Sequence, residues 1–281
     1  MWGIASVING LFDVILAPFR GMHPGVGLMV ISILSGIVML LIFGKTSKQD
    51  AIRRAKNRLK AHIAEIWLFR NDLLQMLLAI AKVLMRTGGY LMHSLRPLIF
   101  IFIPVLVIMV MLGLRYEHRP FLPDETAVLS VFVTDPAWTY GSDVELTGTD
   151  GVEVVSPPLR IPRRGEINWK IQIRKPGTHE ITVRTPEGMA TKKIHAVADA
   201  SVRSSLKPLA ADRGSAFSSA FLLFPAEPPL SATCGVRKIQ IRDWPHQDLS
   251  ILGIGAHWLI VFFVISLAAG FAVKGFFGIE V

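Results

Sequence analysis

A strongly basic segment lies between two uncharged apolar runs. Residues 45–96 contain eleven Lys or Arg side chains and three acidic ones, whereas residues 26–44 and 98–114 contain no charge. In a helix, residues 26–44 would rise about 28 Å, enough to cross the hydrocarbon core of a bilayer. Short loops rich in Lys and Arg stay on the cytoplasmic side of a membrane. The sequence therefore predicts an integral membrane protein in which a cytoplasmic segment joins two transmembrane helices.

The overall composition indicates a soluble part as well. Of the 281 residues 51% are hydrophobic, the mean hydropathy is +0.47 and the net charge is +9. A bundle made only of transmembrane helices would be more apolar than this. The one cysteine, Cys234, can form no internal disulfide, so we expect the soluble part to fold without one.

The N-terminal residues 1–20 have the pattern of an amphipathic helix. Apolar side chains recur at helical spacing from Trp2 to Phe19, and Ser6, Asn9 and Asp13 share the opposite side. This pattern predicts a helix that lies in the membrane interface and ends near Pro18. The alternative, a first transmembrane helix over the same residues, stays open.

The basic segment 45–96 is expected to form a cytoplasmic helical hairpin of coiled-coil type. Its first arm, residues 47–70, places apolar residues on one stripe and basic residues elsewhere, as in an amphipathic helix. Its second arm, residues 73–86, is apolar but short for a transmembrane helix. Positive charge on both sides of residues 73–92 also argues against a further membrane crossing there, which is the competing interpretation.

Residues 116–248 change to a polar, strand-like pattern. Alternating apolar and polar residues between Gly- and Pro-containing turns predict an antiparallel β-sandwich domain outside the cytoplasm, with residues 200–235 as a long loop. A third transmembrane helix is then predicted at residues 251–273, followed by a cytoplasmic tail at 274–281. The predicted strands are residues 126–133, 143–148, 152–156, 166–174, 178–185, 190–197 and 236–242.

Two stretches carry a resemblance to a known family. LFDVILAPFR precedes the first predicted transmembrane helix, and FGKTSKQDAIRRAKNRLKAHIAEI begins the basic hairpin. Together with the order of elements, they resemble the YidC/Oxa insertase superfamily, and in particular its three-span branch. That branch includes the archaeal YidC-like proteins and the third subunit of the ER membrane complex. The resemblance covers residues 1–115 and 251–281 and leaves out residues 117–248.

The resemblance implies an insertase that helps newly made hydrophobic segments to enter the bilayer without ATP. Members of the family use a hydrophilic groove open to the cytoplasm and a locally thinned membrane. Such a groove offsets part of the cost of placing a charged group at the bilayer centre, about 2.5–3.5 kcal/mol. The chain departs from the family in two ways. Residues 26–44 lack the arginine found in many family grooves, and the predicted β domain lies between the second and third membrane helices.

Three sets of residues are candidates for function. Serines in the membrane helices could line a groove, although such serines more often bond their own backbone. Flexible methionines could contact apolar clients, although such methionines more often serve ordinary core and lipid-facing packing. The basic face of the hairpin could bind lipid headgroups or RNA, or could simply follow the charge rule for cytoplasmic loops. The groove candidates are Ser32, Ser35 and Ser266; the methionines are Met76, Met85, Met92, Met109 and Met111; the basic residues are Arg53, Arg54, Lys56, Arg58 and Lys60.

The sequence shows no motif of an enzyme. It contains no P-loop, GxSxG or HExxH motif and no Cys/His cluster at metal-ligand spacing, so we expect no catalytic residues, cofactor or metal. The expected partners are membrane lipids and either nascent membrane proteins or other membrane subunits, with a possible ribosome contact and no DNA. The expected location is a prokaryotic inner membrane, with the N-terminus outside and the C-terminus in the cytoplasm. The alternative function is a non-catalytic accessory subunit of a larger envelope complex.

Overall fold

The computed structural model describes residues 2–47, 57, 98–141, 143–199, 206–247, 249–251 and 254–279. These residues form two compact units. Unit 1 combines residues 1–27 with 109–258, and unit 2 combines residues 28–108 with 259–281. Most of the predicted hairpin at residues 45–96 lies outside the described residues.

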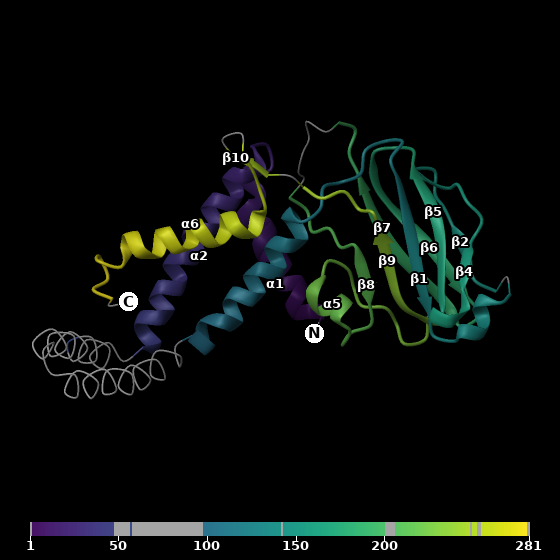
Figure 1. Ribbon diagram of the computed structural model, residues 1–281, viewed down its shortest axis with the longest axis horizontal. Coiled ribbons are helices and arrows are strands. Elements are labelled where there is room, and N and C mark those ends of the chain that lie inside the picture. Colours follow the sequence, from purple (N-terminus) through teal and green to yellow (C-terminus); the bar gives the residue numbers. More distant parts are fainter. Residues whose placement is uncertain are drawn as a thin grey trace, which may run out of the picture. The chain divides into compact units, whose positions relative to one another are not determined.

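Apolar helices dominate the first and last parts of the chain (Figure 1). Three helical stretches in the described part are long and apolar enough to cross a membrane, whereas α6 is a shorter apolar helix of 16 residues. Pro24 begins the helix of residues 24–46, since the fixed φ of proline suits a first helical position and its missing N–H costs nothing there. The three long stretches are Trp2–Phe19, comprising α1 (Trp2–Leu16) and the 3-10 turn η1 (Ala17–Phe19), α2 (Pro24–Thr46), and the helix Leu98–Tyr116; α6 is Trp258–Val273.

The predicted third membrane helix begins later than expected. Residues 251–257 were included in it, but β10 (Leu249–Ile251) and β11 (Ile254–Ala256) pair as an antiparallel hairpin, and α6 starts only at Trp258. A short apolar run fits a strand as well as a helix, so hydropathy alone could not separate the two. Gly255, a poor helix former, lies in the hairpin opposite Ser250.

In unit 2, α2 and α6 approach closely at small residues. A side chain at Gly36 would collide with the backbone of Ser266, and a Cβ at Gly270 would lie 3.5 Å from the carbonyl oxygen of Gly36. Close backbone approach at Gly and Ser is typical of packed membrane helices. We conclude that these small residues serve the packing of the two helices.

The polar part of unit 1 consists mainly of two antiparallel sheets. The larger has the strand order β3-β5-β1-β9-β8, with β4 also paired to β5, and the smaller has the order β2-β6-β7. The strands of the larger sheet are β1 (Thr126–Val133), β3 (Val152–Val154), β4 (Leu159–Ile161), β5 (Glu166–Ile173), β8 (Asp212–Gly214) and β9 (Val236–Arg242). Those of the smaller are β2 (Glu145–Thr147), β6 (Gly177–Thr185) and β7 (Gly188–Ala196).

Both sheets contribute to one hydrophobic core. Alternate residues of the strands point inward, as the two-residue period of a strand requires. Leu129, Val131 and Ile171 of the larger sheet are fully buried in the same cluster as Ile181 and Ile194 of the smaller one. The prediction of antiparallel sheets beside apolar helices is therefore confirmed, including strands at 126–133 and 236–242 with unchanged bounds.

The segment predicted as a long loop contains regular structure. Within residues 200–235, β8 adds an edge strand to the larger sheet and α5 (Ser219–Leu223) forms a short helix. The Ser218 side chain caps α5 by accepting a hydrogen bond from the Phe221 N–H at 3.2 Å. The loop prediction was wrong here because both elements are too short for a periodic signal. The 3-10 turns η2 (Pro136–Thr139) and η3 (Pro162–Arg164) complete the fold.

Candidate functional site

A fully buried arginine holds the N-terminal helix. Arg115, in the helix Leu98–Tyr116, donates to the Asp13 carboxylate at 2.8 Å, and to the Asn9 side-chain and backbone oxygens at 3.2 and 3.1 Å. It also bonds its own helix at the Met111 carbonyl, 3.0 Å away. Its guanidinium lies 5.6 Å from the centre of the Phe12 ring. Two of the three residues predicted for the polar side of α1, Asn9 and Asp13, thus make contacts inside unit 1, whereas Ser6 is exposed.

Helix α1 also contacts the segment between β7 and β9, which includes α5. Asn9 donates to the Pro225 carbonyl at 2.8 Å, and the Trp2 ring lies 6.4 Å from that of Phe221. The opposite side of α1 is exposed and apolar: Ile4, Val7 and Val14 are each at least 70% exposed. The buried side of α1 carries Asn9 together with Phe12 and Leu16, while its outward side is largely apolar, unlike the outward side of a helix in a soluble protein.

A second buried cluster lies at the free edge of the smaller sheet. The Lys192 ammonium of β7 is fully buried, contacts the Glu227 carboxylate and donates to the Ala210 carbonyl at 2.6 Å. Glu227 also accepts the Lys193 N–H at 3.1 Å, so it satisfies an edge donor of the strand. Arg213 lies 3.9 Å from Glu227 and donates to Thr191. Burial lowers the pKa of the Lys192 ammonium, and Glu227 opposes this shift.

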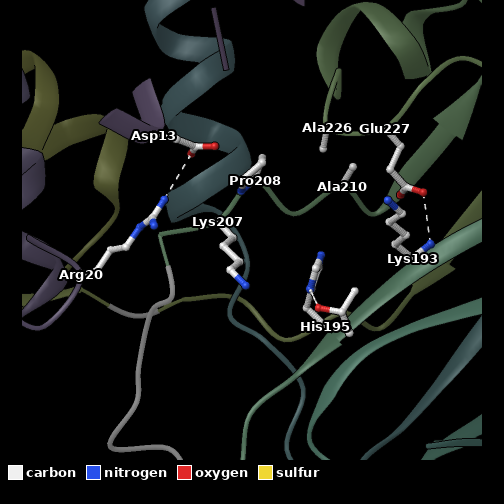
Figure 2. A pocket seen from close by; sticks show the side chains of 10 residues that line it. Asp13, Arg20, Lys193, His195, Lys207, Pro208, Ala210, Ala226 and Glu227 are labelled. Carbon is white, nitrogen blue, oxygen red and sulfur yellow. Dashed lines mark hydrogen bonds and ion pairs between the residues drawn. The ribbon is translucent and has the colours of Figure 1, made fainter. Parts of the chain in front are cut away.

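A cavity of about 270 Å³ lies between these two clusters, inside unit 1. Figure 2 shows Arg20 and Asp13 on one side of it, Lys193 and His195 on another, and Lys207 extending towards His195. Lys193 and His195 share one face of β7, since they are two residues apart in the strand. The remaining lining residues are Thr178, Pro208, Ala210, Ala226 and Glu227.

His195 is neutral at physiological pH in this position. Burial lowers its pKa to about 4, and the positive charges of Lys207, Lys192 and Lys193 act in the same direction, whereas Glu227 opposes them. One ring nitrogen, Nδ1, lies 2.8 Å from the Thr178 hydroxyl on the paired strand β6. The low pKa shows that the cavity disfavours a further positive charge.

The His195 pKa leads to a prediction for stability against pH. Between about pH 6.5 and pH 4 the unfolded chain binds more protons at this position than the folded one does. We therefore expect the stability of unit 1 to fall as the pH drops through this range, and the fall to be smaller in H195Q. Thermal unfolding followed by tryptophan fluorescence from pH 4 to 7 measures it. The matched control is H246Q, at a histidine with a largely exposed side chain. Equal pH profiles for H195Q and the unaltered protein would contradict the prediction.

Two of the three serines predicted to line a groove bond within their own helices. Ser32 and Ser35 are buried in α2, and the Ser32 hydroxyl donates to the Leu28 carbonyl at 2.6 Å. Ser266 of α6 donates to the Phe263 carbonyl at 3.1 Å. The structure thus places the Ser32 and Ser266 hydroxyls in local backbone contacts, and the Ser266 backbone in the packing with Gly36.

Of the predicted methionines and basic residues, the structure describes only Met109 and Met111. Met111 is buried and Met109 is half-buried in the helix Leu98–Tyr116, so Met111 offers no surface to a client. The remaining methionines and the basic face of the hairpin, Met76, Met85, Met92, Arg53, Arg54, Lys56, Arg58 and Lys60, lie outside the described residues. Within the described part of the chain, no group of three or more His, Cys, Asp or Glu side chains is placed to hold a metal ion.

Sequence reasoning missed Arg115, Lys192, Glu227 and the role of His195. One signal was available: Asn9 and Asp13, spaced by one helical turn, form a polar side on an otherwise apolar helix. Nothing local identified Glu227 as the partner of Lys192, because 35 positions separate them. No protein-family model, curated protein or solved structure matches the chain.

Proposed function

We propose that this protein is an insertase-like membrane protein that helps nascent hydrophobic segments to enter the bilayer. Two apolar helices, α2 and Leu98–Tyr116, cross the membrane, and α6 enters it as a short third helix. The β-rich part of unit 1 lies outside the cytoplasm as a sandwich-like domain that contacts partners. The resemblance of residues 1–115 and 251–281 to the YidC/Oxa superfamily supports this assignment.

One observation carries the proposal: α6 is short. Its 16 residues rise about 24 Å, against a hydrocarbon core of about 30 Å. A short apolar helix is accommodated by local thinning of the bilayer. A thinner bilayer lowers the cost of moving the polar flank of a client across it, and this cost is the main barrier to insertion. The outward side of α6 is apolar, with Ile260, Val264 and Leu267 each about 60% exposed, and it offers a surface for a client helix.

The orientation follows from charge. The basic residues 45–96 lie in the cytoplasm, which places the N-terminus and the β-rich part outside and the C-terminus in the cytoplasm. Helix α1 lies in the outer interface in this arrangement. Its contacts with Phe221 and Pro225 support this, because they join Trp2 and Asn9 of α1 to the β-rich part that lies outside. The location that fits these assignments is a prokaryotic inner membrane.

The first test changes the length of α6. Inserting four leucines after Val273 adds about 6 Å and so removes the mismatch with the bilayer. We expect insertion of a client with a charged translocated flank to fall about three- to tenfold. Insertion into vesicles containing the purified protein measures it, with protection of the flank from protease as the readout. The matched control, A268L, adds apolar surface at an exposed position of α6 without changing its length. Unchanged insertion by the lengthened variant would remove the main support of the proposal.

The second test separates an insertase from the alternative, an accessory subunit. A photo-crosslinking residue at Leu267 should capture nascent membrane segments during translation, because this side chain is exposed on α6. The same residue at Met189, equally exposed but on β7, should not. Positions Met76 and Met85 extend the test to the predicted hairpin. Crosslinks only to stable membrane proteins, formed without translation, would instead establish the accessory-subunit function.

A further inference from the structure

The cavity beside α1 has an excess of positive charge. Of the described residues that line it, Arg20, Lys193 and Lys207 are cations, and Asp13 and Glu227 are carboxylates. Both carboxylates are already engaged with cations behind the cavity wall. Asp13 accepts from the buried Arg115, and Glu227 contacts the buried Lys192 and lies near Arg213. Arg20 also lies 4.0 Å from Asp13, so the described groups in and directly behind the wall comprise six basic side chains against two carboxylates.

Neutral polar groups in the same wall suit the oxygens of an anion. The Thr178 hydroxyl is exposed next to His195, and His195 is neutral and bonded to it through Nδ1. Because the two groups share one hydrogen bond, the pair keeps one donor for an acceptor oxygen, either the Thr178 hydroxyl or the His195 Nε2–H. The groups come from three separate places in the chain: Arg20 follows α1, Thr178 and His195 pair across β6 and β7, and Lys207 precedes β8 (Figure 2). All of these groups line the same cavity.

We propose that this cavity binds the phosphate group of an anionic ligand, with Arg20, Lys193 and Lys207 as its charged contacts. A guanidinium and ammonium groups form charge-assisted hydrogen bonds to phosphate oxygens, which are stronger than neutral ones. A lipid headgroup and a soluble phosphate ester share this chemistry. The lipid source rests on the proposed function, since it requires that the exposed apolar face of α1 lies in the outer interface.

Binding is tested on the full chain with two probes. In detergent the probe is sn-glycerol 3-phosphate, and in nanodiscs it is phosphatidylglycerol in a phosphatidylcholine background. The readout is the titration of His195, followed by NMR of its ring protons with the other histidine signals assigned. A bound anion offsets the charges of Lys207, Lys192 and Lys193 and adds to that of Glu227. The His195 pKa should therefore rise from about 4 towards its ordinary value.

The variant R20Q/K193Q should weaken binding of the effective probe by about tenfold or more, since it removes two of the three charged contacts. The control K170Q removes one exposed charge of β5, which belongs to the other sheet, and should leave binding unchanged. A response to glycerol phosphate assigns a soluble ligand, and a response only to phosphatidylglycerol assigns a lipid; both support the site. No response to either probe, or equal loss in K170Q, overturns it. Client insertion is measured separately, so loss of insertase activity with phosphate binding intact would reject the proposed function alone.

Discussion

Replacing Glu227 with glutamine should lower the free energy of unfolding of unit 1 by about 3–5 kcal/mol, because it leaves the buried Lys192 ammonium without a counter-charge. The side chain of Lys192 is fully inaccessible to solvent, and Glu227 is nearly so. The carbonyl of Ala210 can accept one hydrogen bond from the ammonium but cannot neutralise it. Urea unfolding of the full chain in detergent, followed by tryptophan fluorescence, measures the loss.

Two further variants show whether the charge is the cause. E187Q changes an exposed glutamate in the turn after β6 and should have little effect. K192M/E227Q removes both charges, and the new amide oxygen can still accept the Lys193 N–H. Since replacing a whole buried ion pair is often neutral or stabilising, the double variant should recover most of the stability lost in E227Q. A double variant as unstable as E227Q would show that shape, not charge, sets the cost.

Arg115 is expected to have the second-largest effect. R115M removes the hydrogen bonds that join α1 to the helix Leu98–Tyr116, which run from the guanidinium to the Asn9 side-chain and backbone oxygens and to the Asp13 carboxylate. We expect α1 to lose about 2–4 kcal/mol of protection against opening, because several charge-assisted bonds to a buried group are lost together. Hydrogen exchange of the α1 amides in nanodiscs reports this directly.

The matched control for R115M is R20M. Arg20 also pairs with Asp13, but at 4.0 Å and with its side chain 43% exposed, so its loss should cost under about 1 kcal/mol. Amides of β1, in the centre of the larger sheet, should exchange at the same rate in both variants. Equal exchange of α1 in R115M and the unaltered protein would show that packing, not the arginine, holds the helix.

Helices and strands could be predicted wherever the pattern is local. Uncharged runs such as residues 26–44 predict a helix of membrane length, and α2 covers Pro24–Thr46. Strand residues alternate over β1 and β9 strongly enough to give their bounds, and the turns beside them contain Gly or Pro. These features depend on neighbours within a few positions, which is the range over which periodicity acts.

The sequence by itself therefore determined the apolar helices and most of the strands, while the candidate site was decided by the tertiary structure. Lys192 becomes a buried cation only because Glu227, in a distant loop, reaches the edge of its strand. Asn9 and Asp13 could be predicted to share one side of a helix. The contact of Arg115 with this side could not be predicted, because at least 102 positions separate the arginine from these two residues. The start of α6 at Trp258 likewise depends on the pairing of β10 with β11. A buried charge is stable only beside an opposite charge. When that opposite charge is remote in sequence, no local pattern predicts the contact.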